Sequence, residues 1–389
     1  MVDMGEWEHW GPGHFLNCAD ATTPYALPFD WLFNDFERLN EEIGGYDTFK
    51  LAEYLYLRGV YEGYCSVAGK PNLYGRTSSS ALFSMTANNW NAVCTARTTI
   101  GALAIMPYSV ENGYTQCAEW DENRNFLIEK NLYNLGNYGV DDYIPDGSYI
   151  EGTGYWAYAT ENIYRMAAAL DFAAGDNYGY MDIWAMDTTC YFACFTETNP
   201  KVGSYSMWNF HDGASNAQST SLFNYVSQHY GDPVLAAIRA DHVKHGKAVT
   251  VYDVLFYVPF DPDVEVNMPL DYHLQSMDGA VSRASWEAGS LYVGILGGAN
   301  NINHGDIDSG TFMCENNGIR WFTEFGSEQY NSKNYFSYLG GRFNYFRKNA
   351  EGQSVVFMTS MQETVPYGQA YGGKVRSSRS RITNTARQQ

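Results

Sequence analysis

The spacing of hydrophobic residues changes near residue 265, and this change constrains the fold more than any other feature of the sequence. Before it, apolar residues recur every three or four positions, as on the buried face of a helix. After it, short runs alternate in the period of a strand, such as Leu291, Val293 and Ile295 against Tyr292 and Gly294. The sequence therefore predicts a helical part followed by an antiparallel sheet.

The first part is predicted to consist of sequential helices joined by short connectors. The spacing predicts helices over 48–64, 85–106, 118–135, 155–174, 221–228 and 233–242. Within 17–34, Pro24 and Pro28 interrupt an apolar stretch, so we expect one helix to end there and another to begin. Helices that follow one another without strands are typical of a toroid or a bundle, and both alternatives stay open at this point.

The last part is predicted to contain short strands separated by turns. They fall within 280–286, 290–296, 310–316, 319–325 and 354–360. We place the domain boundary so that a helical domain covers 1–265 and a sheet domain covers 266–370. The basic segment 371–389 is predicted to be a disordered tail.

Composition excludes several classes of protein. With 389 residues, 45% of them hydrophobic, the chain can bury a full core. Its formal charge of −20 argues against binding to nucleic acid or to an anionic membrane. No run of 18 apolar residues exists, so no membrane-spanning helix is expected. The first residues lack the features of a signal peptide, so either the protein stays inside the cell or the signal is absent from this sequence.

The cysteines and aromatic residues indicate which kinds of binding site and cross-link the protein contains. The seven cysteines contain no CxxC pair, so neither a zinc knuckle nor a disulfide framework is indicated. The chain carries 32 Tyr, 21 Phe and 10 Trp, and flat amphipathic rings of this kind stack on sugars. An aromatic-rich core is the alternative explanation.

A first cluster of chemical interest lies at 144–174. Asp146 follows Pro145 in a predicted turn, and Tyr155 is placed in the first turn of the helix after it. Unpaired N–H groups and the helix dipole favour negative charge there. Tyr155 beside Glu151 is therefore a candidate for proton transfer. The alternative is that Tyr155 and Trp156 are core aromatic residues.

A second cluster lies at 297–312, between two predicted strands. His304 can serve as an acid or base near neutral pH. Asp306 and Asp308 could bind a cation, and Glu324 could complete a metal site with Asp306. With so few histidines, the spacing is a weak zinc signature. The alternative is a solvated turn rich in Asn and Asp.

Together these segments resemble the heparinase II/III family of polysaccharide lyases. The matching segments are NNWNAVC at 88–94, PDGSYIEGTGYWAYAT at 145–160, WNFHDG at 208–213, SRASW at 282–286, NHGDIDSGTF at 303–312 and IRWFTEFGSEQY at 319–330. They cover roughly residues 15–355. The resemblance implies an incomplete α/α toroid followed by an antiparallel β-sandwich, with the chain ending at Gln389 earlier than a complete sandwich would, as in a truncated member.

The resemblance also implies an activity. Members of this family cleave uronic-acid-containing polysaccharides by β-elimination, and they neutralise the uronate carboxylate to stabilise an enolate-like anion. Asn89 looks like the group that hydrogen-bonds this carboxylate, Tyr155 like the base, the acid or both, and His304 like the second proton-transfer group or a carboxylate ligand. Residues implied to lie along the substrate are Asn88, Glu151, Trp156, Tyr158 and Arg283.

Two of these roles carry alternatives. Tyr158 competes with Tyr155 for the catalytic role, and Arg283 is either a positive group of the site or a structural ion-pair former. A tyrosine ionises near pH 10, so Tyr155 would need His304, Arg283 or a helix N-terminus to lower its pKa.

The sequence also departs from the family. Asp306 stands where relatives often have a second histidine, and Gln353 and Ser354 replace a His-Asn pair. Both changes weaken the case for a structural divalent cation such as zinc at Asp306 and Glu324, and no organic cofactor is expected.

The expected partner is an acidic polysaccharide. The chain has few Lys and Arg residues, which mildly disfavours a heavily sulfated polymer because each sulfate would need a cationic partner. The family implies a periplasmic or secreted location. The oligomeric state is left open, a homodimer included. Two other functions stay open, a glycoside hydrolase with Glu151 and Asp146 as its carboxylates, and a glycan-binding relative without activity.

Overall fold

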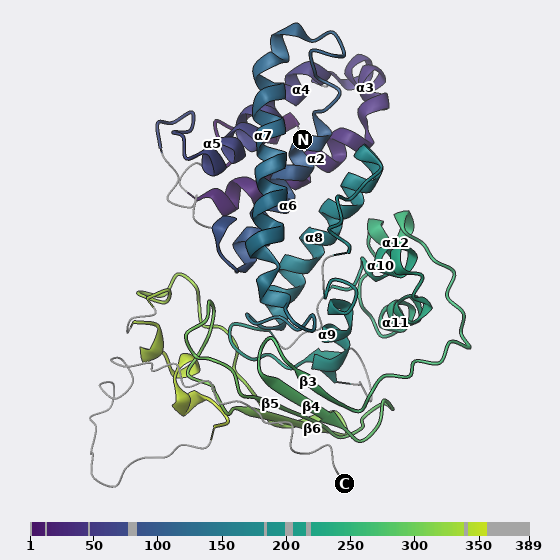
Figure 1. Cartoon of the computed structure of the whole chain (residues 1–389), viewed down its shortest axis with the longest axis vertical. Helices are drawn as coiled ribbons and strands as arrows, with labels where there is room; N and C mark the ends of the chain where they lie inside the picture. The colour runs from purple at the N-terminus through teal and green to yellow at the C-terminus, as the bar shows by residue number, and fades with distance from the viewer. Residues whose placement is uncertain are drawn as a thin grey trace. The chain divides into compact units, whose positions relative to one another are not determined.

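The computed structural model describes residues 2–11, 14–45, 47–76, 84–182, 185–198, 205–214, 219–337 and 341–355. Within these ranges, a helix-rich region comes first and a five-stranded antiparallel sheet lies in the C-terminal part (Figure 1). The predicted fold class is confirmed at this level, while the closure of the helices into a toroid stays a prediction. The predicted tail at 371–389 and most of the predicted strand at 354–360 lie outside the described residues.

The chain forms two compact units. The first comprises Met1–Asp141 and Tyr158–Met181, and the second comprises Asp142–Ala157 and Asp182–Gln389. Helix α8, Thr153–Ala174, begins in the second unit and ends in the first. The predicted domain boundary at 265 falls inside the second unit and stays a prediction.

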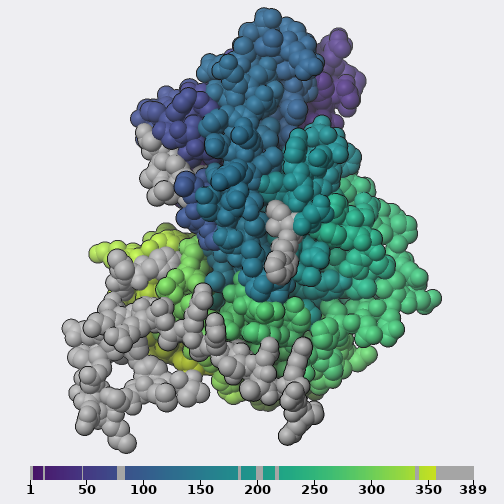
Figure 2. All heavy atoms as spheres, in the orientation of Figure 1, coloured from purple at the N-terminus to yellow at the C-terminus, as the bar shows by residue number. Residues whose placement is uncertain are grey.

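The first unit is helical. Its helices are α1 Val2–Glu6, α2 Phe15–Trp31, α3 Phe36–Ile43, α4 Thr48–Leu55, α5 Tyr61–Ala68, α6 Asn89–Ala104, α7 Ala118–Asn134 and most of α8. Helix α6 packs against both α2 and α7, and the blue atoms of α6 and α7 form a continuous face of this unit in Figure 2. No helix of the described ranges is long and apolar enough to cross a membrane.

Helix α2 corrects one expectation. It runs without interruption from Phe15 to Trp31 and contains both Pro24 and Pro28, where we expected a break. Each proline removes one backbone N–H donor from the helix. The helix persists because residues at helical spacing are fully buried in it, namely Ala19, Tyr25, Ala26 and Phe29. Tertiary packing therefore outweighs the local preference to end the helix.

The second unit combines short helices with the sheet. Its helices are α9 Thr189–Thr196, α10 Phe223–Tyr230, α11 Pro233–Lys244 and α12 Val251–Leu255, and a two-stranded sheet pairs β1 Glu197–Thr198 with β2 Ser206–Met207. The larger sheet has the order β3 Asp271–Leu274, β4 Gly279–Arg283, β5 Tyr292–Leu296, β6 Phe312–Asn316 and β7 Ile319–Phe322, each antiparallel to the next. This order is a simple meander, which places the β5–β6 connection at one end of the sheet.

Strand β5 has the predicted period, and its inner face is decided by a long-range contact. Tyr292, Gly294 and Leu296 point inward, while the side chain of Ile295 is 41% exposed. Gly294 is required on this face because a Cβ atom there would lie 2.8 Å from the ring of Trp208, which is completely buried. The indole of Trp208 thus takes the space that a side chain at 294 would fill.

Candidate functional site

A stacked tyrosine–histidine pair lies at the centre of the candidate site in the second unit. Tyr155 comes from the first turn of α8, as predicted, and His304 from the loop between β5 and β6. Their ring centroids are 3.7 Å apart, with 17° between the ring planes. The phenol oxygen of Tyr155 also shares a hydrogen bond with that of Tyr330, whose ring centroid lies 6.1 Å from that of His304. Two phenols and one imidazole therefore meet at one place.

His304 is held by Asp212. The Nδ1 atom of His304 lies 2.9 Å from Oδ2 of Asp212. His304 adopts a left-handed backbone with φ of 60°, which is uncommon for a residue other than glycine. Arg342 fixes this turn by donating to the carbonyl oxygens of His304 and Gly305, at 2.8 and 2.9 Å. The imidazole is thus fixed through both its ring and its backbone.

Asp212 is the centre of a buried ion-pair cluster, which we define as Asp212, Asp306, Arg342 and Lys348. Oδ1 of Asp212 lies 2.9 Å from Nη2 of Arg342 and 2.8 Å from Nζ of Lys348, and it also accepts a hydrogen bond from the Tyr335 hydroxyl. Burial by itself raises the pKa of Asp212, but the hydrogen bond from His304 and the two cations hold that pKa well below its usual range. Asp212 is therefore ionised at neutral pH.

The ionised Asp212 decides the chemistry of His304. A carboxylate only accepts hydrogen bonds, so Nδ1 of His304 must carry a proton. In the neutral imidazole, Nε2 then carries the lone pair and can take up a proton.

The pKa of Tyr155 is raised, whereas action as a base would need a group that lowers it. Burial is the main cause, and the neighbouring Tyr330 adds to it. Arg283, one of the groups expected to lower it, instead donates to the backbone carbonyls of Cys194 and Phe195 at 3.2 and 3.0 Å. Tyr155 is therefore a neutral phenol at pH 7, and it can donate a proton.

Two other predicted site residues of this unit are also buried. The carboxylate of Glu151 accepts a 2.7 Å hydrogen bond from Nδ2 of Asn303, the residue before His304. The indole N–H of Trp156 donates to Oγ1 of Thr189 at 2.9 Å, and only 2% of Trp156 is exposed. Glu151 thus braces the loop that carries His304, and Trp156 packs in the core.

The remaining predicted residues belong to the first unit. Asn88 is the N-cap of α6, and its side chain accepts from the backbone N–H of Asn91 at 3.1 Å. Asn89 is 1% exposed. The Tyr158 hydroxyl donates to Asp20 at 2.9 Å. The structure brings Tyr155 and His304 together in the second unit, whereas Asn88, Asn89 and Tyr158 lie in the first.

The predicted metal ligands are engaged by other groups. Oδ1 of Asp306 lies 3.0 Å from Nη2 of Arg342, and Oδ2 lies 2.8 Å from Nζ of Lys348. Glu324 accepts a hydrogen bond from the Thr311 hydroxyl. No cluster of three or more His, Cys, Asp or Glu side chains suited to a metal occurs among the described residues. Because two cations already neutralise Asp306, this arrangement does not fit a metal ion, and zinc binding stays a prediction.

Sequence reasoning did not single out several residues that surround His304. They are Asp212, Tyr330, Tyr335, Arg342 and Lys348. Asp212 lies within the quoted segment WNFHDG, where an acid between His and Gly was a usable signal. Tyr330 is the last residue of the quoted segment IRWFTEFGSEQY, whose match gave it no role of its own. Tyr335, Arg342 and Lys348 lie further on, in a stretch without a regular period, so no local pattern identified them.

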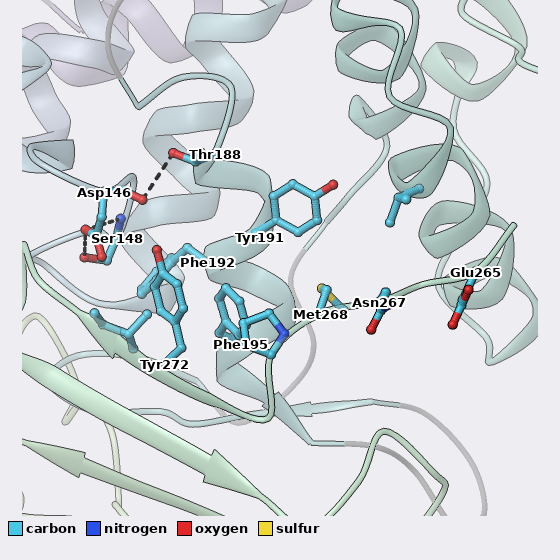
Figure 3. A pocket seen from close by; sticks show the side chains of 13 residues that line it. Asp146, Ser148, Thr188, Tyr191, Phe192, Phe195, Glu265, Asn267, Met268 and Tyr272 are labelled. Atoms are coloured by element: carbon cyan, nitrogen blue, oxygen red, sulfur yellow. Dashed lines mark hydrogen bonds between the residues drawn. The ribbon is translucent and has the colours of Figure 1, made fainter. Parts of the chain in front are cut away.

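Asp146, a carboxylate of the hydrolase alternative, borders an aromatic cavity of about 360 Å³ in the second unit. Figure 3 shows Tyr191, Phe192 and Phe195 of α9 and Tyr272 of β3 among the side chains that line it, and the rings of Phe195 and Tyr272 stack with centroids 4.1 Å apart. The carboxylate of Asp146 accepts from the Ser148 hydroxyl at 2.6 Å and from the Gln275 backbone N–H at 2.8 Å. It thus fixes the turn after β3.

The sequence matches no protein-family model and no curated protein. Among solved structures, it is similar to heparinase III, with 13% identity, a TM-score of 0.51, and coverage of 84% of this chain and 45% of the other. It is also similar to a mutant of the heparan sulfate lyase HepC from Pedobacter heparinus, with 12% identity, a TM-score of 0.46, and coverage of 83% and 42%. The chain spans less than half the length of these proteins, and the likeness to heparinase III shows a distant fold relationship.

Proposed function

We propose that this chain is a polysaccharide lyase that cleaves a uronic-acid-containing polysaccharide by β-elimination. The observation that carries the proposal is the stacked pair of Tyr155 and His304, 3.7 Å apart between ring centroids, with Asp212 behind the imidazole. Such a pair supplies one proton acceptor and one proton donor at one place. The distant fold relationship to heparinase III supports the same class of reaction.

In the proposed reaction, Nε2 of His304 takes the C5 proton of the uronate. The electron pair of the C5–H bond forms the C4=C5 double bond, and the C4–O bond to the neighbouring sugar breaks. The phenol of Tyr155 gives its proton to the leaving oxygen. Two observations support these roles: Asp212 is ionised, and the raised pKa of Tyr155 keeps its phenol protonated. After this step His304 carries one extra proton and Tyr155 lacks one. Both groups are reset when Tyr155 regains a proton through the Tyr330 hydroxyl, which contacts it, and His304 releases its proton to solvent.

The reaction also requires that the uronate carboxylate be neutralised. The role of Asn89 in this step stays a prediction from the resemblance, as does the substrate-binding role of Asn88, Tyr158 and Arg283. The expected periplasmic or secreted location is likewise a proposal.

The test is the ultraviolet absorbance of the new double bond. Sulfated and unsulfated uronate polysaccharides are digested with the wild type, with Tyr155→Phe and with Tyr257→Phe. Tyr257 is a matched control because its side chain is 66% exposed and lies in the same unit. Loss of the acid is expected to reduce the rate about 10²- to 10⁴-fold in Tyr155→Phe, with Tyr257→Phe unchanged.

Each other outcome has a definite meaning. No absorbance from any polymer, or full activity of Tyr155→Phe, contradicts the proposal. New reducing ends without absorbance indicate the hydrolase. Affinity for a polymer without any cleavage indicates the glycan-binding relative.

A further inference from the structure

A second histidine–aspartate pair occurs in the same unit, and the proposed lyase chemistry does not use it. His211 precedes Asp212, and the two side chains reach two residues of the β5–β6 loop. Asp212 contacts His304, while Nδ1 of His211 lies 2.8 Å from Oδ2 of Asp308. The side chains of His211 and Asp308 are 2% and 1% exposed. Two histidine–aspartate pairs therefore join the segment after β2 to this loop. The segment supplies the aspartate of one pair and the histidine of the other.

Both histidines are held in a conformation that ordinary residues avoid. The φ angles of His211 and His304 are 58° and 60°, and such a conformation costs about 1–3 kcal/mol for each residue. It persists because buried cations hold the backbone: Nζ of Lys348 donates to the carbonyl of His211 at 3.3 Å, as Arg342 does to that of His304 at 2.8 Å. The fold thus holds the backbone of both histidines in this conformation.

His211 lines a cavity of about 680 Å³, within the range of about 300–1,000 Å³ that is usual for ligand sites. Because Nδ1 faces Asp308, Nε2 is the ring nitrogen that remains for a ligand. The polar walls are Gln275, Ser276, Asp278 and Asn301, and the apolar walls are Ile144, Ile150, Met277 and Ile302. Ile150 and Ile302 precede the hydrogen-bonded residues Glu151 and Asn303, so the cavity adjoins the candidate site.

The lining selects one class of ligand. Amide, hydroxyl and carboxylate groups together bind sugar hydroxyls, and the isoleucine side chains suit the C–H faces of a sugar ring. An anionic ligand would meet the carboxylates of Asp278 at the wall and Asp308 behind His211. We propose that this cavity binds a neutral sugar residue of a polysaccharide, with Nε2 of His211 as its buried hydrogen-bonding anchor. Binding is independent of cleavage, so this inference goes beyond the proposed reaction.

The test measures binding by the whole chain, with isothermal titration calorimetry and saturation-transfer NMR. The probes are the neutral disaccharides cellobiose, maltose and N,N′-diacetylchitobiose, with digalacturonate as the anionic comparison. The variants are His211→Gln and Asn301→Ala. Asn267→Ala is the matched control, because Asn267 is also exposed but lines the other cavity. Loss of one hydrogen bond is expected to weaken binding of a neutral disaccharide about three- to tenfold in the first two variants.

Several results would overturn the inference. They are no binding of any neutral disaccharide, binding of digalacturonate alone, and equal affinity in the wild type and both cavity variants. Asn301 is exposed, so Asn301→Ala decides the question if His211→Gln does not fold. A chain that binds the disaccharide and yields no unsaturated product keeps this inference and contradicts the lyase. Cleavage without disaccharide binding does the reverse.

Discussion

Replacing Asp212 with asparagine removes one negative charge from the centre of the buried ion-pair cluster. The cluster holds two carboxylates and two cations, and Arg342 and Lys348 are both 0% exposed. In Asp212→Asn, only Asp306 remains to balance both of them. Removal of one partner from a buried pair costs about 3–5 kcal/mol, because the other charge stays buried without compensation. We expect the free energy of unfolding to fall by this amount.

An exposed ion pair in the same unit provides the control. Nε of Arg347 lies 3.7 Å from Oε1 of Glu328, with the two side chains 44% and 26% exposed. Exposed pairs contribute about 0–1 kcal/mol, so Glu328→Gln should have little effect. The measurement is urea unfolding at pH 7, followed by circular dichroism. A loss below about 1 kcal/mol in Asp212→Asn would show that the cluster does not stabilise the fold as argued.

The same substitution also tests the role of Asp212 in positioning His304. An asparagine can donate to Nδ1 of His304, and the imidazole proton then moves to Nε2, where the base is needed. We expect kcat to fall about 10²-fold or more, with little change in KM. Both constants are measured without urea, at a temperature at which the variant is folded. An unchanged kcat in the folded variant would refute the assignment of His304 as the base.

Three further changes test other parts of the structure. Burial alone would raise the pKa of Glu197, but its two basic neighbours His242 and Lys247 outweigh burial and lower that pKa from 4.5 to about 2. The contribution of Glu197 to the free energy of unfolding is therefore present above about pH 4.5 and is lost as the pH falls towards 2. That contribution is about 3 kcal/mol. Between pH 6 and pH 3, the free energy of unfolding should therefore fall less in Glu197→Gln than in the wild type. Gly294→Ala forces a methyl group against the ring of Trp208, and its melting curve should show a loss of about 1–3 kcal/mol. Tyr330→Phe removes the hydrogen-bond partner of the Tyr155 phenol, which the proposed mechanism uses between turnovers, so steady-state kcat should fall by less than in Tyr155→Phe while the single-turnover rate stays unchanged.

Local patterns predicted the elements that carry the candidate site. The helix over 155–174 and the strands within 290–296 and 310–316 correspond to α8, β5 and β6. Asn88 caps α6. The motif around Tyr155 placed that residue in the first turn of a helix, and the motif around His304 placed it between two strands. These features depend on residues close together in the chain, which is why the sequence shows them.

The surroundings of the histidine could not be predicted in the same way. The partners of His304 are 92 residues earlier at Asp212 and 38 residues later at Arg342, and no periodicity links such distant positions. Local sequence also could not show in which direction the pKa of Tyr155 shifts. Burial depends on how the whole unit packs, and it raises the pKa.

The sequence by itself determined where many of the helices and strands form, because hydrophobic period acts over a few residues. Only the tertiary structure decided which face of β5 points inward and that two prolines stay inside α2. It also decided that Asp306 pairs with two cations. Each of these outcomes depends on side chains that the path of the chain brings together, and buried charges or rings at such meeting points outweigh the local preferences.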